Sequence, residues 1–193
     1  MKFSRVWAMP SADTFTVRPM GGLVRRHLRG VSIDPFARNN DWATHTNDIN
    51  PATTAQSHRD ARAFLGDLIQ AGVSADVVIF DPPYSPRQIT ESYASFGKKA
   101  GQEDTQNARL YADCRSLIRQ LCHPGSLVLS FGWNSVGMGK GFDIEEVLLV
   151  CHGGAHNDTI CMVERMLPEP TSTASGLSLE SKGSDEKEGA RHD

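Results

Sequence analysis

The chain has 193 residues, 39% of them hydrophobic and 22% charged, which fits one globular domain with a sizeable core. Its formal net charge of −3 gives no general positive field for nucleic acid. Six of the 23 acidic and three of the 20 basic residues lie in the stretch 168–193, which leaves 17 of each, a neutral balance, in the rest. No apolar run approaches the roughly 20 residues that span a bilayer, and the start lacks the apolar core of a signal peptide.

The cysteines show no paired spacing, so reduced, buried thiols are expected rather than disulfides. They are Cys114, Cys122, Cys151 and Cys161. A zinc site built from Cys151, His152, His156 and Cys161 is the alternative, but this spacing matches no framework of structural zinc sites.

The first part of the chain predicts a lead-in, a helix and a strand. Residues 1–14 are expected to be a lead-in that packs on the domain. The helix runs from Met20 to Leu28, with Pro19 in its first turn and its end near Gly30. A short strand then covers 31–34 and ends at Pro35.

A second strand is predicted at 43–48, ending in an acid. An acid at that place is the usual ligand of a ribose diol, so Asp48 is a candidate for that contact. Asn50-Pro51 is expected to open a helix at 52–57. A longer helix follows at 61–71, where Asp60 is either an ordinary N-cap or a further ligand at the sheet edge.

The central predicted strand, 76–80, ends in Asp81-Pro82-Pro83-Tyr84. Neither proline has an N–H to donate, so this corner offers acceptors, the Asp81 carboxylate and the Pro82 carbonyl, with an aromatic plane beside them. Two acceptors suit an exocyclic amine of a nucleobase, and Tyr84 can stack on the base face. The base must be flipped out of a duplex or already unpaired.

The stretch 85–106 is long for a loop of a compact domain, which indicates function or mobility. We expect it to begin at the site with Ser85, to close over substrate, and to bring Arg87, Lys98 and Lys99 near phosphates. A disordered surface loop with solvated lysines is the alternative.

The last part of the domain predicts a helix at 108–122, a strand at 126–131 and two strands at 142–150 and 159–164 that form a hairpin. Trp133 and Asn134 follow the first of these strands and can line a pocket for the flipped base, although Trp133 is equally well interpreted as a core aromatic. Residues 168–193 are Ser-, Gly- and charge-rich and are expected to be disordered, which leaves one domain at 1–167.

Asp81 to Tyr84 also matches the DPPY signature of amino-methyltransferases. Over roughly 3–164 the sequence resembles a compact group of adenine-specific DNA methyltransferases common in bacteriophages and prophages. The stretches that carry the resemblance are Ser32–Asn39, Thr46–Pro51, Asp81–Gln88, Ser130–Asn134 and Gly153–Asp158.

This resemblance implies S-adenosylmethionine as cofactor and the Rossmann-like α/β sheet of class I methyltransferases with a C-terminal antiparallel hairpin. It places Asp34 near the cofactor's ammonium group, although Asp34 can also be interpreted as a turn cap. The other implied cofactor contacts are Phe15, Pro35, Phe36, Ala37, Asp48, Ile49 and Asp60. The sequence departs from the family at 37–40, where Ala-Arg-Asn-Asn replaces the usual glycine-rich turn.

The implied reaction is direct transfer of a methyl group to N6 of a flipped or unpaired adenine in DNA, without a covalent enzyme intermediate. Asp81 and the Pro82 carbonyl orient the amine, Pro83 stiffens the corner and Tyr84 stacks. RNA adenine, the N4 amine of cytosine, or a non-catalytic module that keeps the fold remain as alternatives. A cytoplasmic location, in a bacterium or a phage-infected host cell, is expected.

Overall fold

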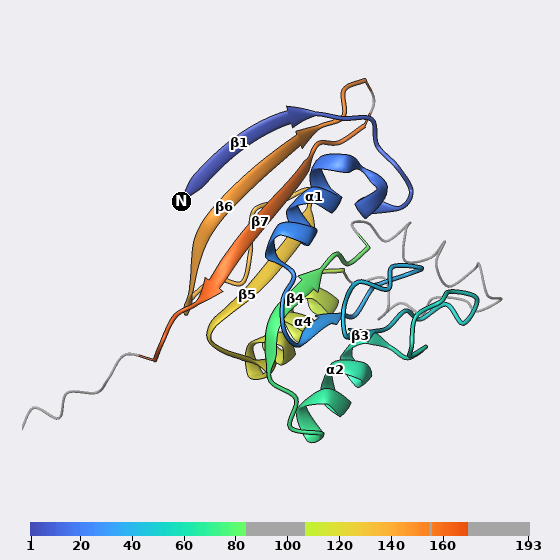
Figure 1. Cartoon of the computed structure of the whole chain (residues 1–193), viewed down its shortest axis with the longest axis vertical. Helices are drawn as coiled ribbons and strands as arrows, with labels where there is room; N and C mark the ends of the chain where they lie inside the picture. Colours follow the sequence, from blue (N-terminus) through green and yellow to red (C-terminus); the bar gives the residue numbers. More distant parts are fainter. Residues whose placement is uncertain (84–106, 155, 170–193) are drawn as a thin grey trace, which may run out of the picture.

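The computed structural model describes residues 1–83, 107–154 and 156–169, and in this part seven strands form one sheet (Figure 1). The order across the sheet is β1-β6-β7-β5-β4-β2-β3. Only β7 runs antiparallel to its neighbours, β5 and β6, while the other pairs are parallel. The strands are β1 Lys2–Trp7, β2 Ser32–Asp34, β3 His45–Thr46, β4 Ala75–Phe80, β5 Cys122–Gly132, β6 Phe142–Cys151 and β7 Thr159–Met166.

Helices cover both faces of the sheet and bury one core on each side (Figure 1). Helix α1, Arg18–His27, follows the 3₁₀ turn η1, Thr14–Thr16, and packs Leu23 and Val24 on one face. Helices α2, Ala61–Gln70, and α4, Asn107–Leu121, pack Leu65 and Ile118 on the other. Strands β4 and β5 therefore contribute apolar side chains to both cores, which explains the apolar run 77–80 of β4.

The helix boundaries follow local sequence signals. Pro19 lies in the first turn of α1, where its missing N–H costs no hydrogen bond. Asp60 caps α2 by accepting the backbone N–H of Arg62 at 2.9 Å. Gly72 follows α2 with a φ of 70°, a conformation that glycine adopts without a steric penalty.

The lead-in at 1–14 contains a strand that the sequence analysis did not predict, because residues 2–7 form the edge strand β1. It pairs in parallel with β6, from Lys2 opposite Glu146 to Trp7 opposite Cys151. Phe3 and Trp7 are 63% and 66% exposed, so the large apolar residues of β1 point away from the core. The sequence of 2–7 also lacks the regular alternation of apolar and polar residues that identifies a half-buried strand.

The expected helix at 52–57 is also absent; the segment forms turns and one parallel bridge, Asn47 with Ser57. The Asn50 side chain accepts the backbone N–H of Ala52 at 2.9 Å, and the backbone of Ser57 donates to Thr46 at 3.1 Å. Local side-chain acceptors and strand pairing thus satisfy the groups that a helix would have used.

Two strands differ in extent from their predictions. β3 covers only two residues, so Asp48 lies just beyond it. β5 begins at Cys122, before His123-Pro124-Gly125, and its register with β4 shifts between Ala75 and Val77. The proline and glycine are accommodated at this irregular start of the strand.

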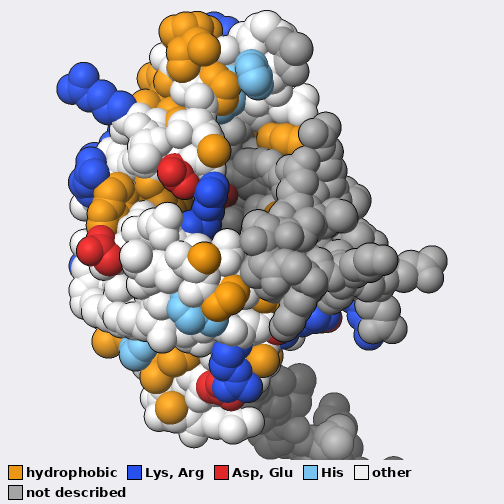
Figure 2. Space-filling model, turned by 90° about the vertical axis from the view of Figure 1, so that its right-hand side faces the viewer, with side chains coloured by type: hydrophobic (Ala, Val, Ile, Leu, Met, Phe, Trp, Pro, Cys, Tyr) orange, Lys and Arg blue, Asp and Glu red, His pale blue; other side chains and the backbone are white. Residues whose placement is uncertain are grey.

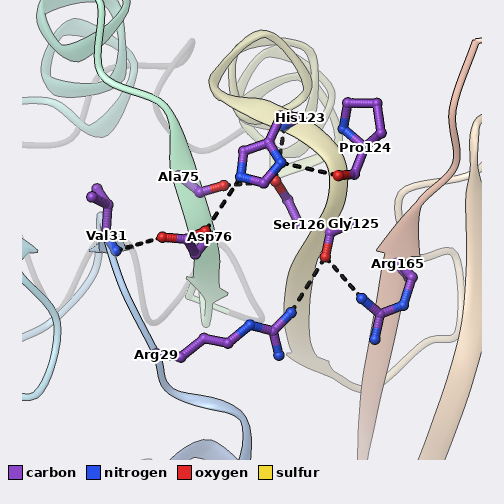
Figure 3. A network of polar contacts seen from close by, with 9 residues as sticks. All are labelled: Arg29, Val31, Ala75, Asp76, His123, Pro124, Gly125, Ser126 and Arg165. Carbon is purple, nitrogen blue, oxygen red and sulfur yellow. Dashed lines mark hydrogen bonds and ion pairs between the residues drawn. The ribbon is translucent and has the colours of Figure 1, made fainter.

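A polar network fixes the edge of the sheet where β4 and β5 begin (Figure 3). Asp76 accepts the backbone N–H of Val31 at 2.8 Å and lies 3.3 Å from Nε2 of His123. Arg29 and Arg165 both donate to the carbonyl of Gly125, at 3.3 and 2.9 Å. These contacts tie four segments together at one edge, and the opposite edge, where the parallel strands end, carries the candidate site.

The α/β sheet with a closing antiparallel hairpin, predicted from the sequence, is thus confirmed: β6 and β7 form that hairpin. Among the described residues, no helix combines the length and apolar character required to cross a membrane.

Candidate active site

Three carboxylates meet at the edge where the parallel strands β2, β3 and β4 end. Asp34 is the last residue of β2, Asp48 lies two residues after β3, and Asp81 directly follows β4. The charges of Asp81 and Asp48 both raise the pKa of Asp34. Asp34 is therefore close enough to interact with both acids, as expected for polar residues at the carboxyl ends of adjacent strands.

Asp34 is a buried carboxylate that lacks part of its hydrogen bonding. Its side chain is 1% exposed in the folded chain, and Oδ1 accepts the backbone N–H of Phe36 at 3.1 Å. Oδ2 is buried and has no hydrogen-bond partner among the described residues. Burial raises the pKa of Asp34 well above its ordinary value, the two neighbouring acids add to this, and the Phe36 N–H opposes it. A bound cation would supply the missing partner.

Asp48 is also buried, at 8% exposure, but both of its oxygens have partners. Oδ2 accepts the backbone N–H of Arg38 at 3.1 Å, and Oδ1 accepts that of Asn50 at 2.8 Å. Burial raises the pKa of Asp48, while these two N–H groups and the nearby charges of Arg38 and His58 oppose the rise. Each carboxylate oxygen has a second lone pair, so Asp48 can still accept from a hydroxyl group.

The turn after β2 is built without glycine. Pro35 is buried, Phe36 packs on Phe80 with ring centroids 6.1 Å apart, and Ala37 donates its N–H to the carbonyl of Asn47 at 2.8 Å. Arg38 supplies the left-handed conformation, with a φ of 52°. The chain thus forms this turn without the usual glycines by holding one residue, Arg38, in a strained backbone conformation.

Two further predicted cofactor contacts are Phe15 and Ile49. Phe15 stacks on Trp42, with ring centroids 6.0 Å apart, and meets the edge of Phe131 at 5.1 Å, so it joins η1 to the end of β5. Ile49 is half-buried next to Asp48.

Asp60 is engaged by its own helix. Both of its oxygens accept from Arg62, whose Nε and Nη2 each lie 2.9 Å away. Partial burial raises the pKa of Asp60, but the hydrogen bonds and charge of Arg62 outweigh it and leave the pKa lowered. Asp60 is thus the N-cap of α2, and its contact with the cofactor stays a prediction.

A pocket of about 130 Å³ lies beside the proline corner, lined from β4, β5, β7, α4 and the segment after β5. Pro82 is buried and lines the pocket. Asp81, the residue before it in the chain, is half-buried. Trp133 and Asn134 line the same pocket, and Trp133 is 43% exposed, which excludes the core-aromatic interpretation. The other lining residues include Phe80, Tyr111, Arg115, Ser130, Ile160 and Met162.

Tyr111 is a site residue that the sequence analysis missed. Its hydroxyl donates to the carbonyl of Pro83 at 2.5 Å, and its ring meets Phe80 edge-on at 6.0 Å. Burial and the charge of Asp81 raise its pKa, so the hydroxyl stays a donor at neutral pH. Its spacing with Cys114 and Ile118 places it on the inner face of α4, a signal that could have been used.

The remaining predicted site residues lie outside the described part of the chain. They are Tyr84, Ser85, Arg87, Lys98 and Lys99.

Two other kinds of chemistry find no support in the described residues. No group of three or more His, Cys, Asp and Glu side chains there could hold a metal ion. Asp76, His123 and Ser126 have the residue types of a hydrolase triad, but Ser126 is fully buried and donates to the carbonyl of Ala75 at 2.6 Å (Figure 3).

The cysteines are free, as expected for reduced thiols. Burial raises the pKa of both Cys114 and Cys122 to about 12. Neither is a ready nucleophile at neutral pH, because the thiolate is the reactive form.

Charge is mixed on one face of the molecule. On the face in Figure 2, positive and negative side chains lie near one another and form no continuous basic patch. This agrees with the neutral balance of the sequence outside 168–193.

The strand order, the single antiparallel strand and the polar residues at one sheet edge define a class I methyltransferase fold. Three similar solved structures are TrmN from Thermus thermophilus, NSun6 from Pyrococcus horikoshii with SFG, and the putative methyltransferase yhhF from Escherichia coli. Their sequence identities to this chain are 16%, 12% and 12%, with TM-scores of 0.49, 0.46 and 0.45.

The matches cover 76%, 72% and 83% of this chain and 48%, 48% and 92% of the respective structures. The chain thus spans about half the length of the first two. No protein-family model matches the sequence, and neither does any curated protein.

Proposed function

We propose that this chain is an S-adenosylmethionine-dependent methyltransferase that acts on the N6 amine of a flipped or unpaired adenine in DNA. One observation carries the proposal. A buried carboxylate oxygen of Asp34, with no hydrogen-bond partner in the described part of the chain, lies at the same sheet edge as the acceptor corner that begins at Asp81. A site for a cation and a site for an amine are thus next to each other.

The described residues fit the cofactor. Asp34 holds its ammonium group, and this contact supplies the partner that Oδ2 lacks. Asp48 accepts from the ribose hydroxyls with its remaining lone pairs. Phe15, Ile49 and the turn 35–37 border this space, and Asp60 contributes by fixing the start of α2. When bound, the cofactor supplies an electrophilic methyl group on a sulfonium.

The target amine is held by acceptors. Its lone pair is delocalised into the base, so it becomes nucleophilic only when the two N–H bonds are directed away from the ring plane. The Asp81 carboxylate and the Pro82 carbonyl accept these two bonds, and the pocket lined by Trp133 and Asn134 receives the base. The contribution of the protein is placement and fixed electrostatics, with no covalent intermediate.

We assign this function to a domain at 1–167, with the Ser- and charge-rich stretch 168–193 outside it. Tyr84 stacks on the base and Ser85, Arg87, Lys98 and Lys99 contact the nucleic acid in this proposal. Since the residues outside 168–193 carry equal numbers of acidic and basic side chains, affinity for DNA rests on such local contacts and falls steeply with salt.

The test is transfer of a labelled methyl group to unmethylated DNA and to RNA of the same sequence. We expect incorporation into DNA as N6-methyladenine and a loss of at least about a hundredfold in Asp81→Ala and Asp81→Asn, given the usual cost of an electrostatic contact to the reacting group. Asp41→Asn, which removes an exposed acid, is the matched control.

The outcomes separate the alternatives. Incorporation into RNA alone, or as N4-methylcytosine, would mean that the substrate is not DNA adenine but that the protein still transfers a methyl group to an exocyclic amine. An Asp81 variant as active as the wild type would remove the role of the corner. Absence of S-adenosylmethionine binding in calorimetry of the folded wild type would favour a non-catalytic module.

A further inference from the structure

One face of α4 carries three hydrogen-bond donors at a spacing of four residues, and each donates to a backbone carbonyl of the proline corner or of the segment after β5. The Tyr111 hydroxyl donates to Pro83 at 2.5 Å, and Arg115 Nη1 donates to Gly137 at 3.2 Å. Arg119 donates to Met138 at 2.9 Å and to Lys140 at 2.5 Å. Residues four apart on a helix project to the same side, so α4 contacts both rims of the pocket with one row of side chains.

The rim formed by the segment after β5 is also held from the opposite side. Glu164 of β7 is 2% exposed and accepts the backbone N–H of Met138 with both oxygens, at 2.9 and 3.0 Å. Gly137 has a φ of 57° and packs so closely on Glu164 that an added Cβ would lie 2.5 Å from Oε1. This rim, which carries Trp133 and Asn134, is therefore held by the donors of α4 on one side and by the acceptor Glu164 on the other.

The rim formed by the proline corner has fewer means of fixing itself. Pro82 and Pro83 have no N–H, so two successive residues cannot donate to neighbouring acceptors. A donor from another element is needed to hold this stretch of backbone. The Tyr111 hydroxyl supplies it at the residue immediately after the proposed Pro82 acceptor.

We propose that Tyr111 is the positioning residue of the acceptor corner: by holding the Pro83 carbonyl, it fixes the directions of the Pro82 carbonyl and the Asp81 carboxylate towards the pocket. This inference rests on the proposed function and names a residue that acts through its neighbours. Arg115 and Arg119 hold the other rim in the same way, so α4 sets the distance between the two.

Tyr111→Phe tests the inference, because it removes the hydroxyl and keeps the ring that packs on Phe80. We expect kcat for methyl transfer to fall about tenfold, since loss of one hydrogen bond that orients reacting groups has this order of effect. The KM for DNA and the Kd of S-adenosylmethionine should each change less than about twofold, because uniform binding is not altered. Ser116→Ala, which removes a hydroxyl from the exposed side of α4, is the matched control.

A second measurement does not depend on activity. Hydrogen exchange at the backbone N–H of Asp81 should be about tenfold faster in Tyr111→Phe than in the wild type and the control, given the free energy of one hydrogen bond. Unchanged exchange would overturn the anchoring of the corner even if no substrate were known.

The kinetic outcomes are equally decisive. A Tyr111→Phe variant with wild-type kcat, or one that only raises the KM for DNA, would overturn the positioning role, the latter because it indicates direct substrate contact. No methyl transfer by the wild type, together with faster exchange in the variant, would refute the proposed function and leave the anchoring intact.

Discussion

The backbone N–H of Arg38 donates to Oδ2 of Asp48 at 3.1 Å, and Arg38 makes this contact from the left-handed region, with a φ of 52°. A residue with a Cβ is disfavoured there by roughly 1–2 kcal/mol. The turn therefore holds the proposed ribose ligand in place at a cost to the free energy of folding.

Replacing Arg38 separates its backbone from its side chain. Arg38→Gly and Arg38→Ala both remove the ion pair with Asp13, 3.3 Å long and exposed at both ends, but only glycine relieves the backbone. We expect Arg38→Gly to be more stable than Arg38→Ala by about 1 kcal/mol. Urea denaturation measures the difference, and equal stabilities would show that the turn is not strained.

Asp34 should reduce the stability of the cofactor-free protein. Asp34→Asn keeps an acceptor for the Phe36 N–H and removes a buried charge that faces Asp81 and Asp48. We expect the free energy of unfolding at pH 7 to rise by about 1–3 kcal/mol, while binding of S-adenosylmethionine is lost. Thermal unfolding and calorimetry report the two effects, and a variant that is destabilised yet still binds would contradict both.

The same residue sets two opposite pH dependences. The folded pKa of Asp34 is raised, so the folded, cofactor-free protein binds this proton more tightly than the unfolded chain. The contribution of Asp34 to stability is therefore most favourable below its unfolded pKa, about 3.9, and declines as pH rises to the folded pKa. Asp34→Asn should lack this decline in urea titrations at several pH values.

Cofactor binding should change in the other direction. A cation next to Asp34 favours the carboxylate, so affinity should fall as pH drops below the raised pKa, by up to about tenfold per pH unit for one proton. Calorimetry in buffers of different ionisation enthalpy would detect the proton released on binding in this range. A pH-independent affinity would place the cation elsewhere.

Gly137 and Gly139 form a matched pair. Both have positive φ, 57° and 74°, but an added Cβ at Gly139 meets nothing within 4 Å, whereas at Gly137 it meets Glu164 at 2.5 Å. Gly137→Ala should therefore cost about 1–3 kcal/mol more stability than Gly139→Ala, because the buried carboxylate has no room to move. Denaturation of both variants provides the comparison, and equal losses would show that Glu164 adapts.

Glu146 is the centre of an ion cluster between β6, β1 and α1. It lies 2.9 Å from Arg26 and 3.3 Å from both Lys2 and His27. Burial raises the pKa of Glu146, but its hydrogen bonds to His27 and Lys2 and the charge of Arg26 outweigh this and leave the pKa lowered. The resulting stability is present above the unfolded pKa, about 4.3, and is lost as pH falls through the folded value.

Glu146→Gln should destabilise the protein by about 1–2 kcal/mol at pH 7 and by much less near pH 3. The neighbouring Glu145, which pairs with Arg165 at a more exposed position, is the control; its replacement by Gln should cost less than about 1 kcal/mol. A pH-independent loss in Glu146→Gln would contradict the ionic role.

The sequence predicted the central elements well where one signal was strong. The apolar run of β4 and the Gly72 stop of α2 are local, and the structure has both. The Asp60 cap of α2, which the sequence left open against a ligand role, is present too. β1 was missed because its partner lies about 140 residues away and its large side chains face outwards. The expected helix at 52–57 failed because the Asn50 side chain and a bridge to Asn47 bind the backbone instead.

At the candidate site, the sequence identified the carboxylates because each follows a predicted strand. It did not show that Asp34 lacks a partner for one oxygen, which depends on packing. Nor did it show Tyr111, because the hydroxyl meets Pro83 across 28 positions of the chain. Contacts between a helix face and a strand end are properties of the assembled fold.

The pairing of β1 with β6 also constrains the order in which the chain can assemble. Contacts this distant in sequence close a long loop, and their entropy cost delays them relative to local structure. During synthesis, the six residues of β1 emerge well before their partner in 142–151 exists. Until translation has passed Cys151, the backbone of β1 has no complete strand to pair with, so the pairing of β1 with β6 should be a late step of folding.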